Sequence, residues 1–241
     1  TALFGDRAGT LVFAMYVCSL LLIVGGGMLL RATVLRGVRA EPLLIDLPRY
    51  QAPVPRLVAA VTWTRLLAFL RTAAGIIVVT VCGVWLLSAV PAHPGAGAFC
   101  AVPVEDSAFA ATSRALAPVF QPAGFGDWHT TGALVVGVVA KEAVVSSWAQ
   151  THARSEPDDL RSPGALGDAL GADFAVSSGG HPRAAGLAFL LFVLGYAPCV
   201  ATLTAQVREI GPRWTFLALG ISLTTCWLVA VAVFQAGRVL G

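Results

Sequence analysis

The feature that most constrains this chain is a long uncharged stretch with a proline near its middle. Residues 184–207 carry no charge, and about 20 apolar residues suffice for a helix to cross a membrane. The centre reads Gly195-Tyr196-Ala197-Pro198-Cys199. Pro198 has no backbone donor, so the carbonyl of Leu194 loses its helical partner, and unpaired backbone at membrane depth is tolerated only against protein or a polar cavity. The stretch therefore predicts a membrane helix broken at Pro198, and transporters build ion sites in this way.

Composition indicates an integral membrane protein. Of the 241 residues, 57% are hydrophobic and only 12% are charged, whereas about 25% are charged in an ordinary soluble domain. The net charge of +3 and the lack of a basic run with interleaved aromatics argue against nucleic acid as a partner. The sequence has no P-loop, no GxSxG motif and no CxxC pair, so we expect no enzyme in this chain. It begins at Thr1 without a basic leader, so we expect no signal peptide and expect a piece of something longer or a separate subunit.

The hydrophobic pattern predicts an all-α integral membrane protein with about five apolar helical segments. We divide the chain into a first transmembrane helix (1–35), a cytoplasmic Arg- and Pro-rich loop with an interfacial helix near 57–70 (36–72), a second transmembrane helix (73–90), an external loop with an amphipathic helix near 107–119 (91–128), a spanning or re-entrant segment (129–150), a mobile polar loop (151–183) and a broken helix paired with a final span (184–237).

Arginine placement predicts the orientation. Seven arginines lie between Arg31 and Arg71, against one in residues 91–128, and an excess of basic residues marks the cytoplasmic side. If all five segments cross, the N-terminus is outside and the C-terminus is cytoplasmic. If residues 130–150 re-enter on the same side, everything after them is reversed.

Lys141 and Glu142 are the only charges inside an apolar segment. Neither has an opposite charge three or four residues away on its own helix, and a charge at the bilayer centre costs about 2.5–3.5 kcal/mol on insertion scales. We interpret Glu142 as lining a cation route and Lys141 as making a structural contact. The alternative is an interfacial segment in which both side chains reach the lipid headgroups.

Cys199 is the candidate metal ligand beside the break. A thiolate is a soft ligand, and the Leu194 carbonyl, Tyr196 and Thr202 lie near it in sequence. The alternative is that this cysteine is a small hydrophobe, which is our expectation for Cys18, Cys82 and Cys226. The histidines lack the close spacing of a metal site, so we expect them to be solvated: His93, His129, His152 and His181.

Four stretches resemble, in order, the C-terminal half of the ferrous iron transport protein B family. They are Leu47-Pro48-Arg49-Tyr50-Gln51-Ala52-Pro53, Ala73-Ala74-Gly75-Ile76-Ile77 with Val84-Trp85-Leu86-Leu87-Ser88, Val139-Ala140-Lys141-Glu142-Ala143-Val144-Val145-Ser146, and Phe192-Val193-Leu194-Gly195-Tyr196-Ala197-Pro198-Cys199-Val200-Ala201-Thr202 with Arg208-Glu209 after it. Gly195 stands where the family usually has a bulkier apolar residue.

The resemblance implies a multi-pass carrier of Fe²⁺ in the bacterial inner membrane, with two gate regions related by pseudo-symmetry. It implies Cys199 as the gate cysteine, Pro198 and Tyr196 as shaping the break, and Lys141, Glu142 and Ser146 near the pathway. It also implies a G-domain that hydrolyses GTP with Mg²⁺, expected before Thr1 together with the first gate half.

These observations predict one half of a ferrous iron transporter, with Fe²⁺ bound by Cys199, the Leu194 backbone and Glu142. Lys141, Ser146, Tyr196, Pro198 and Thr202 are the predicted gating residues. The partners expected are the lipid bilayer, Fe²⁺, the missing domains and, as an open alternative, further copies of the chain. Two other functions stay open: a carrier of a nucleoside or another divalent metal, and a membrane scaffold that moves nothing.

Overall fold

The part of the chain that the structure describes is helical. This computed structural model describes residues 3–5, 8–33, 36, 52–95, 97–139, 141, 143–152, 164–196 and 198–240. Within them the α-helices are α1 (Ala8–Ala32), α2 (Pro55–Ala89), α3 (Ala108–Leu116), α4 (Trp128–Gly137), α5 (Ala143–Thr151), α6 (Gly164–Ser177), α7 (Pro182–Gly195), α8 (Val200–Ile210) and α9 (Pro212–Leu240), with short 3-10 turns η2 (Val104–Asp106), η3 (Ala117–Val119) and η4 (Gln121–Ala123). The all-α prediction is confirmed for these residues, which contain no strand.

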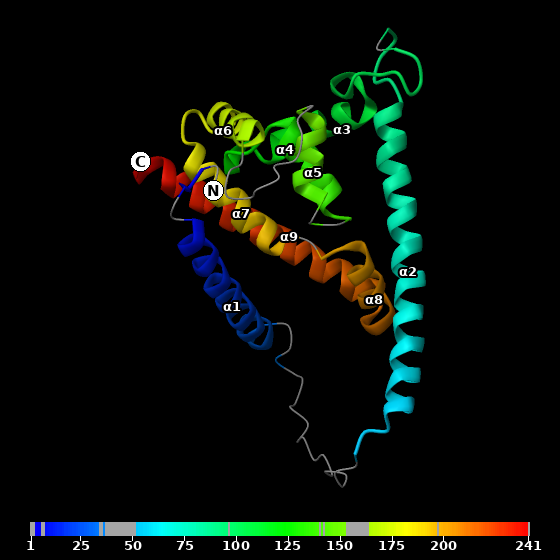
Figure 1. Cartoon of the computed structure of the whole chain (residues 1–241). Helices are drawn as coiled ribbons and strands as arrows, with labels where there is room; N and C mark the ends of the chain where they lie inside the picture. The colour runs from blue at the N-terminus through cyan, green and yellow to red at the C-terminus, as the bar shows by residue number, and fades with distance from the viewer. Residues whose placement is uncertain are drawn as a thin grey trace.

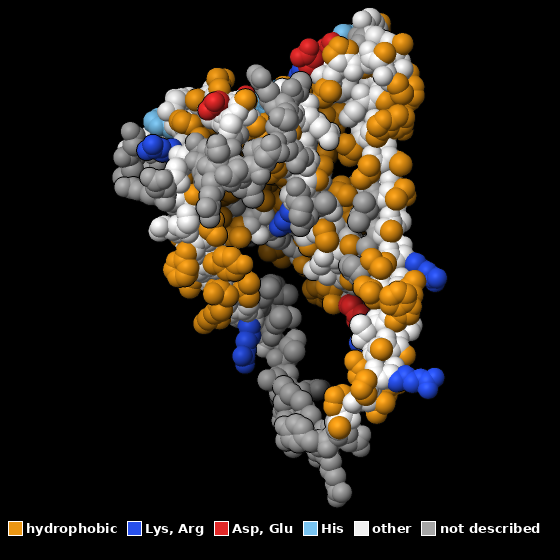
Figure 2. Space-filling model, in the orientation of Figure 1, with side chains coloured by type: hydrophobic (Ala, Val, Ile, Leu, Met, Phe, Trp, Pro, Cys, Tyr) orange, Lys and Arg blue, Asp and Glu red, His pale blue; other side chains and the backbone are white. Residues whose placement is uncertain are grey.

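Two helices are long and apolar enough to cross a membrane. They contain the stretches Ala8–Leu29 of α1 and Pro212–Val239 of α9, which lie where the first and last membrane helices are predicted. Large apolar side chains on α1 are exposed, Phe13 and Ile23 among them, and Figure 2 shows hydrophobic side chains spread over this helix and over α2. An apolar surface of this extent suits contact with lipid rather than with water.

The predicted break at Pro198 is confirmed. Helix α7 ends at Gly195, α8 begins at Val200, and the two axes are bent by 40°. Cys199 is the N-cap residue of α8, and its backbone is extended (φ −61°, ψ 156°). A proline ring clashes with the preceding turn and disfavours helical backbone at the residue before it, which accounts for a helix end at this point.

The middle of the chain departs from the predicted segments. A single helix, α2, runs through the ranges expected to form an interfacial helix and a second span, because no proline interrupts residues 56–89. Among the described side chains of α2, the apolar part is Val78–Ala89, which is shorter than a span. Five spans are therefore not seen in the described residues: two helices qualify, or three if α7 and α8 count as one bent span.

The third apolar segment is two short helices, and the polar loop contains a helix. Helices α4 and α5 pack against each other with Lys141 in the connection between them. The expectation of a loop over residues 151–183 was wrong for residues 164–177, where an Ala-rich sequence forms α6. The predicted amphipathic helix is confirmed as α3, capped by Ser107, whose Oγ accepts from Ala110 N at 3.2 Å.

An aromatic core joins these elements. The pairing of α7 with α9 is the most extensive helix contact, and stacked and edge-on rings fill the space beside it: Phe120, Phe125, Trp148, Phe174, Phe189 and Phe192. Both chain ends lie near the start of α7 (Figure 1). A Cβ on Gly186 would meet Leu3, and a Cβ on Gly237 would lie 2.8 Å from that of Ala184.

Candidate functional site at the broken helix

Side chains from two other elements bind the carbonyls at the end of α7. Lys141 Nζ, from the connection between α4 and α5, donates to Val193 O at 3.0 Å. Ser222 Oγ, from α9, donates to Gly195 O at 2.6 Å. The last carbonyls of a helix have no partner within it and carry partial negative charge, so they suit an ammonium or a hydroxyl donor. The break is thus built from three elements that are far apart in sequence.

Tyr196 fixes the position of the break. Its side chain is 2% exposed, and its hydroxyl donates to Leu134 O in α4 at 3.3 Å. Lys141 Nζ lies 5.2 Å from the centre of its ring, within range of a cation–π interaction. Gly137 makes room for this tyrosine, because a Cβ there would lie 2.5 Å from Tyr196 Oη.

Cys199 and Thr202 lie together on the first turn of α8. Cys199 is half-buried, and its Sγ is 3.1 Å from Thr202 Oγ1. No described His, Asp or Glu joins Cys199 in a group of three ligand side chains. Thr202 Oγ1 is an oxygen ligand available to a metal ion beside this sulfur.

Cys226 of α9 lies directly behind the break. A Cβ on Gly195 would approach Cys226 Sγ to 2.7 Å, so a larger residue at 195 would require the sulfur to move. This contact accounts for glycine at that position. The local sequence pattern gives no signal for it, since residue 226 is separated from the break by α8, a tight turn and about four turns of α9.

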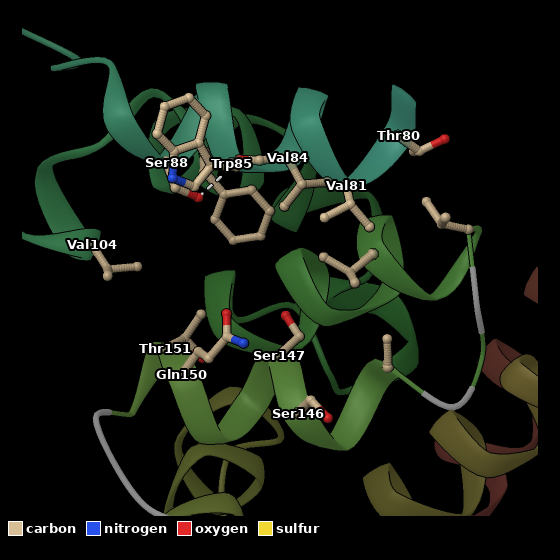
Figure 3. Close-up of a pocket in the computed structure, with 14 residues that line it drawn as sticks. Thr80, Val81, Val84, Trp85, Ser88, Val104, Ser146, Ser147, Gln150 and Thr151 are labelled. Carbon is tan, nitrogen blue, oxygen red and sulfur yellow. Dashed lines mark hydrogen bonds between the residues drawn. The ribbon is translucent and has the colours of Figure 1, made fainter. Parts of the chain in front are cut away.

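The remaining predicted residues are placed in different surroundings. Leu194 lines a cavity of about 950 Å³ between α1, α7 and α9. Ser146 lines another, of about 400 Å³, between α2 and the α4–α5 pair (Figure 3). Figure 3 shows Ser147 and Gln150 of α5 facing Val84 and Trp85 of α2 across this space. Glu142 lies outside the described residues, so its place in a cation route stays a prediction.

The expectation that the histidines are solvated was wrong for two of them. The rings of His129 and His152 stack with centroids 4.0 Å apart, and both side chains are partly buried. They are 23 residues apart, and only the return of the chain through α4 and α5 brings them together. Helical spacing could not reveal this pair. His93 fits the expectation, since it is exposed, with its Nε2 3.6 Å from a carboxylate oxygen of Asp106.

Fold and site together define an all-helical membrane protein with a discontinuous helix. The family model described as "Nucleoside recognition" matches residues 70–213, and that described as "Ferrous iron transport protein B C terminus" matches residues 12–65. The chain belongs to the ferrous iron transport protein B family. This confirms the resemblance that the four motifs carry.

Proteins named Fe(2+) transporter FeoB match nearly the whole chain. The Fe(2+) transporter FeoB of Methanocaldococcus jannaschii is 31% identical over 242 residues, which are 99% of this chain and 34% of that protein. The Fe(2+) transporter FeoB of Salmonella typhimurium is 29% identical over 275 residues, and the match covers 97% of this chain and 35% of that protein. The chain thus spans about a third of the length of the curated relatives that it matches. No solved structure matches it.

Proposed function

We propose that this chain is the C-terminal part of a permease for Fe²⁺ and that the ion passes the break between α7 and α8. The observation that carries the proposal is the discontinuous helix with Cys199 and Thr202 on the turn that follows it. The relatives named Fe(2+) transporter support the choice of ion. Broken helices place backbone carbonyls and helix ends beside the substrate in many transporters.

The proposed ligands are few, and the ion is held weakly. The Cys199 thiolate and the Thr202 hydroxyl offer sulfur and oxygen, and the Leu194 carbonyl and Glu142 complete the predicted set. Fe²⁺ accepts mixed N, O and S ligands. A site with one thiolate and neutral oxygens releases its ion more readily than a closed cage, and conduction requires such release.

Lys141 restricts the route. Its ammonium is bound to Val193 O, so a cation that approaches the end of α7 from this side meets a fixed positive charge. Two like charges 4 Å apart repel by about 4 kcal/mol at an effective dielectric constant of 20, and a divalent ion doubles this value. The favoured route therefore runs on the Cys199 side of the break while Lys141 holds its position.

The arrangement favours the re-entrant alternative for residues 129–150. Helices α4 and α5 pack against each other, and His129 at the start of α4 stacks on His152 at the end of α5. The two chain ends lie at the same end of the molecule (Figure 1). We place Arg31, Arg56 and Arg65 on the cytoplasmic side. Both chain ends are then external, whereas the five-span alternative has a cytoplasmic C-terminus. We assign the protein to the bacterial inner membrane, with the first gate half and a GTP- and Mg²⁺-binding G-domain on residues that precede Thr1 in the whole protein.

The test is Fe²⁺ uptake by the whole transporter carrying Cys199→Ser or Cys199→Ala. Loss of the thiolate should reduce uptake at least tenfold, with protein levels in the membrane unchanged. Cys82→Ser is the matched control, because Cys82 is an exposed cysteine on α2. Wild-type uptake by both Cys199 variants would remove this residue from the mechanism.

Two measurements separate the proposal from its alternatives. A water-soluble thiol reagent should label Cys199 if an aqueous path reaches the break, and a packed scaffold predicts no labelling. The description "Nucleoside recognition" of one family model makes a nucleoside carrier the second candidate. Competition of radioactive Fe²⁺ uptake by nucleosides, Mn²⁺ and Zn²⁺ distinguishes it, since inhibition by nucleosides alone would favour that candidate.

A further inference from the structure

A second group of ligand-type side chains lies away from the broken helix. His129 is the second residue of α4, His152 directly follows α5, and Asp173 lies on α6. One ligand atom from each of the three lies within 4.8 Å of the other two, and this is the one such group among the described residues. His152 Nε2 is 2.9 Å from Asp173 Oδ2.

Polar atoms in this cluster are buried without hydrogen-bond partners. Within the described ranges, six buried side-chain nitrogen and oxygen atoms have none, and all fall on residues 127–130, residues 148–152 and Asp173: Asp127 Oδ2, His129 Nδ1, Thr130 Oγ1, Trp148 Nε1, His152 Nε2 and Asp173 Oδ2. A buried polar atom without a partner costs roughly 1–3 kcal/mol, so a ligand shared by His129, His152 and Asp173 would be stabilising here. Trp148 Nε1 can only donate a hydrogen bond and is not one of its ligands.

The closest pair has a spacing that two ligands of one cation can also have. His152 Nε2 lies 2.9 Å from Asp173 Oδ2, where the imidazole and the carboxylate also attract each other directly. Two ligands about 2.05 Å from one metal ion are about 2.9 Å apart at the 90° of an octahedral site and about 3.3 Å apart at the tetrahedral angle. The ring of His129 stacks on that of His152, which keeps a His129 nitrogen within 4.8 Å of the other two ligand atoms.

Charged groups around the cluster act on it in both directions. Asp127 repels the carboxylate of Asp173, and His152 attracts it. A bound cation would relieve the repulsion between these two carboxylates, whereas Arg114, which lies over the Trp128 ring, opposes it.

We propose that His129, His152 and Asp173 form a binding site for a divalent transition-metal cation, separate from the broken helix. Two imidazoles and one carboxylate with open positions suit Fe²⁺ or Zn²⁺. Helices α4, α5 and α6 lie at the end of the molecule where α2 finishes, opposite the arginine-bearing start of α2 (Figure 1). If the orientation proposed above holds, this site faces the outside, where an incoming ion first meets the protein.

The test uses Co²⁺ as a spectroscopic probe on the purified whole transporter in detergent. The wild type should bind at least one equivalent of Co²⁺ with the visible absorption of nitrogen and oxygen ligation. His152→Ala and Asp173→Asn should each bind one equivalent less. His93→Ala is the control for a histidine outside the cluster and should bind as much as the wild type. Equal stoichiometry in the wild type and both cluster variants would overturn the proposal.

Two further measurements make the result independent of folding and of the broken helix. Co²⁺ should raise the melting temperature of the wild type by more than that of Asp173→Asn, which keeps only the other sites; an equal rise in both would count against the site. Cys199→Ser should keep the Co²⁺ equivalent that His152→Ala loses. Loss of this equivalent in Cys199→Ser would show that the ion binds at the broken helix and would also overturn the proposal. If the Cys199 variants transport Fe²⁺ like the wild type, the proposed function fails, but the Co²⁺ stoichiometry of the histidine cluster is still tested.

Discussion

Gly137 is the position at which the packing around Tyr196 can be tested most directly. A Cβ at this residue would lie 2.5 Å from Tyr196 Oη and 2.7 Å from Val144 Cγ2. Ordinary contacts between carbon atoms are about 3.5–4.0 Å, so Gly137→Ala forces both neighbours to move by close to 1 Å. Overpacking of a core by one methyl group costs about 1–3 kcal/mol, and the change from glycine to alanine within a helix returns up to about 1 kcal/mol.

We expect Gly137→Ala to lower the free energy of unfolding by about 2 kcal/mol. In a protein that already carries Tyr196→Phe and Val144→Ala, adding Gly137→Ala should leave the free energy of unfolding unchanged or raise it slightly. Both close atoms are then absent, and the next atom, Tyr196 Cζ, is at 3.8 Å. The coupling between the sites should therefore be about 2–3 kcal/mol.

The assay is SDS-induced unfolding of the whole transporter in detergent micelles, followed by circular dichroism, with Fe²⁺ uptake measured on the same variants. Gly75→Ala is the matched control, because a Cβ at Gly75 in α2 meets no atom within 4 Å. The packing argument would be refuted by an equal cost of Gly137→Ala with and without the two compensating substitutions.

Two further predictions concern the polar contacts at the end of α7. Lys141→Met removes a charged hydrogen bond to Val193 O and should destabilise the protein by about 1.5–3 kcal/mol in the same SDS titration. Lys141→Arg should recover part of this loss. An unchanged unfolding midpoint in Lys141→Met would contradict the contact. Ser222→Ala leaves the Gly195 carbonyl without this donor and should cost about 1–3 kcal/mol, and increased thiol labelling of Cys199 is expected because the break loosens. Unchanged stability and labelling would show that this hydrogen bond does not hold the break.

Local features explain which parts of the fold could be predicted. The end of α7 and the start of α8 follow from Pro198, because the missing donor and the ring clash act on the adjacent turn whatever surrounds it. Helices α1 and α9 follow from long apolar runs. The continuity of α2 could not be foreseen, because the change from arginine-bearing to apolar sequence at residues 71–73 alters the solvent of the helix but not its backbone preference.

The sequence by itself determined the membrane class, the position of the break and the family, since each depends on composition or on residues adjacent along the chain. Only the tertiary structure decided what surrounds the break. Lys141, Ser222 and Cys226 reach it from two other elements, and His129 meets His152 and Asp173 across three helices. The physical reason is that a pattern along the sequence reports which face of a helix is apolar, whereas the partners across that face are chosen by how the helices pack together.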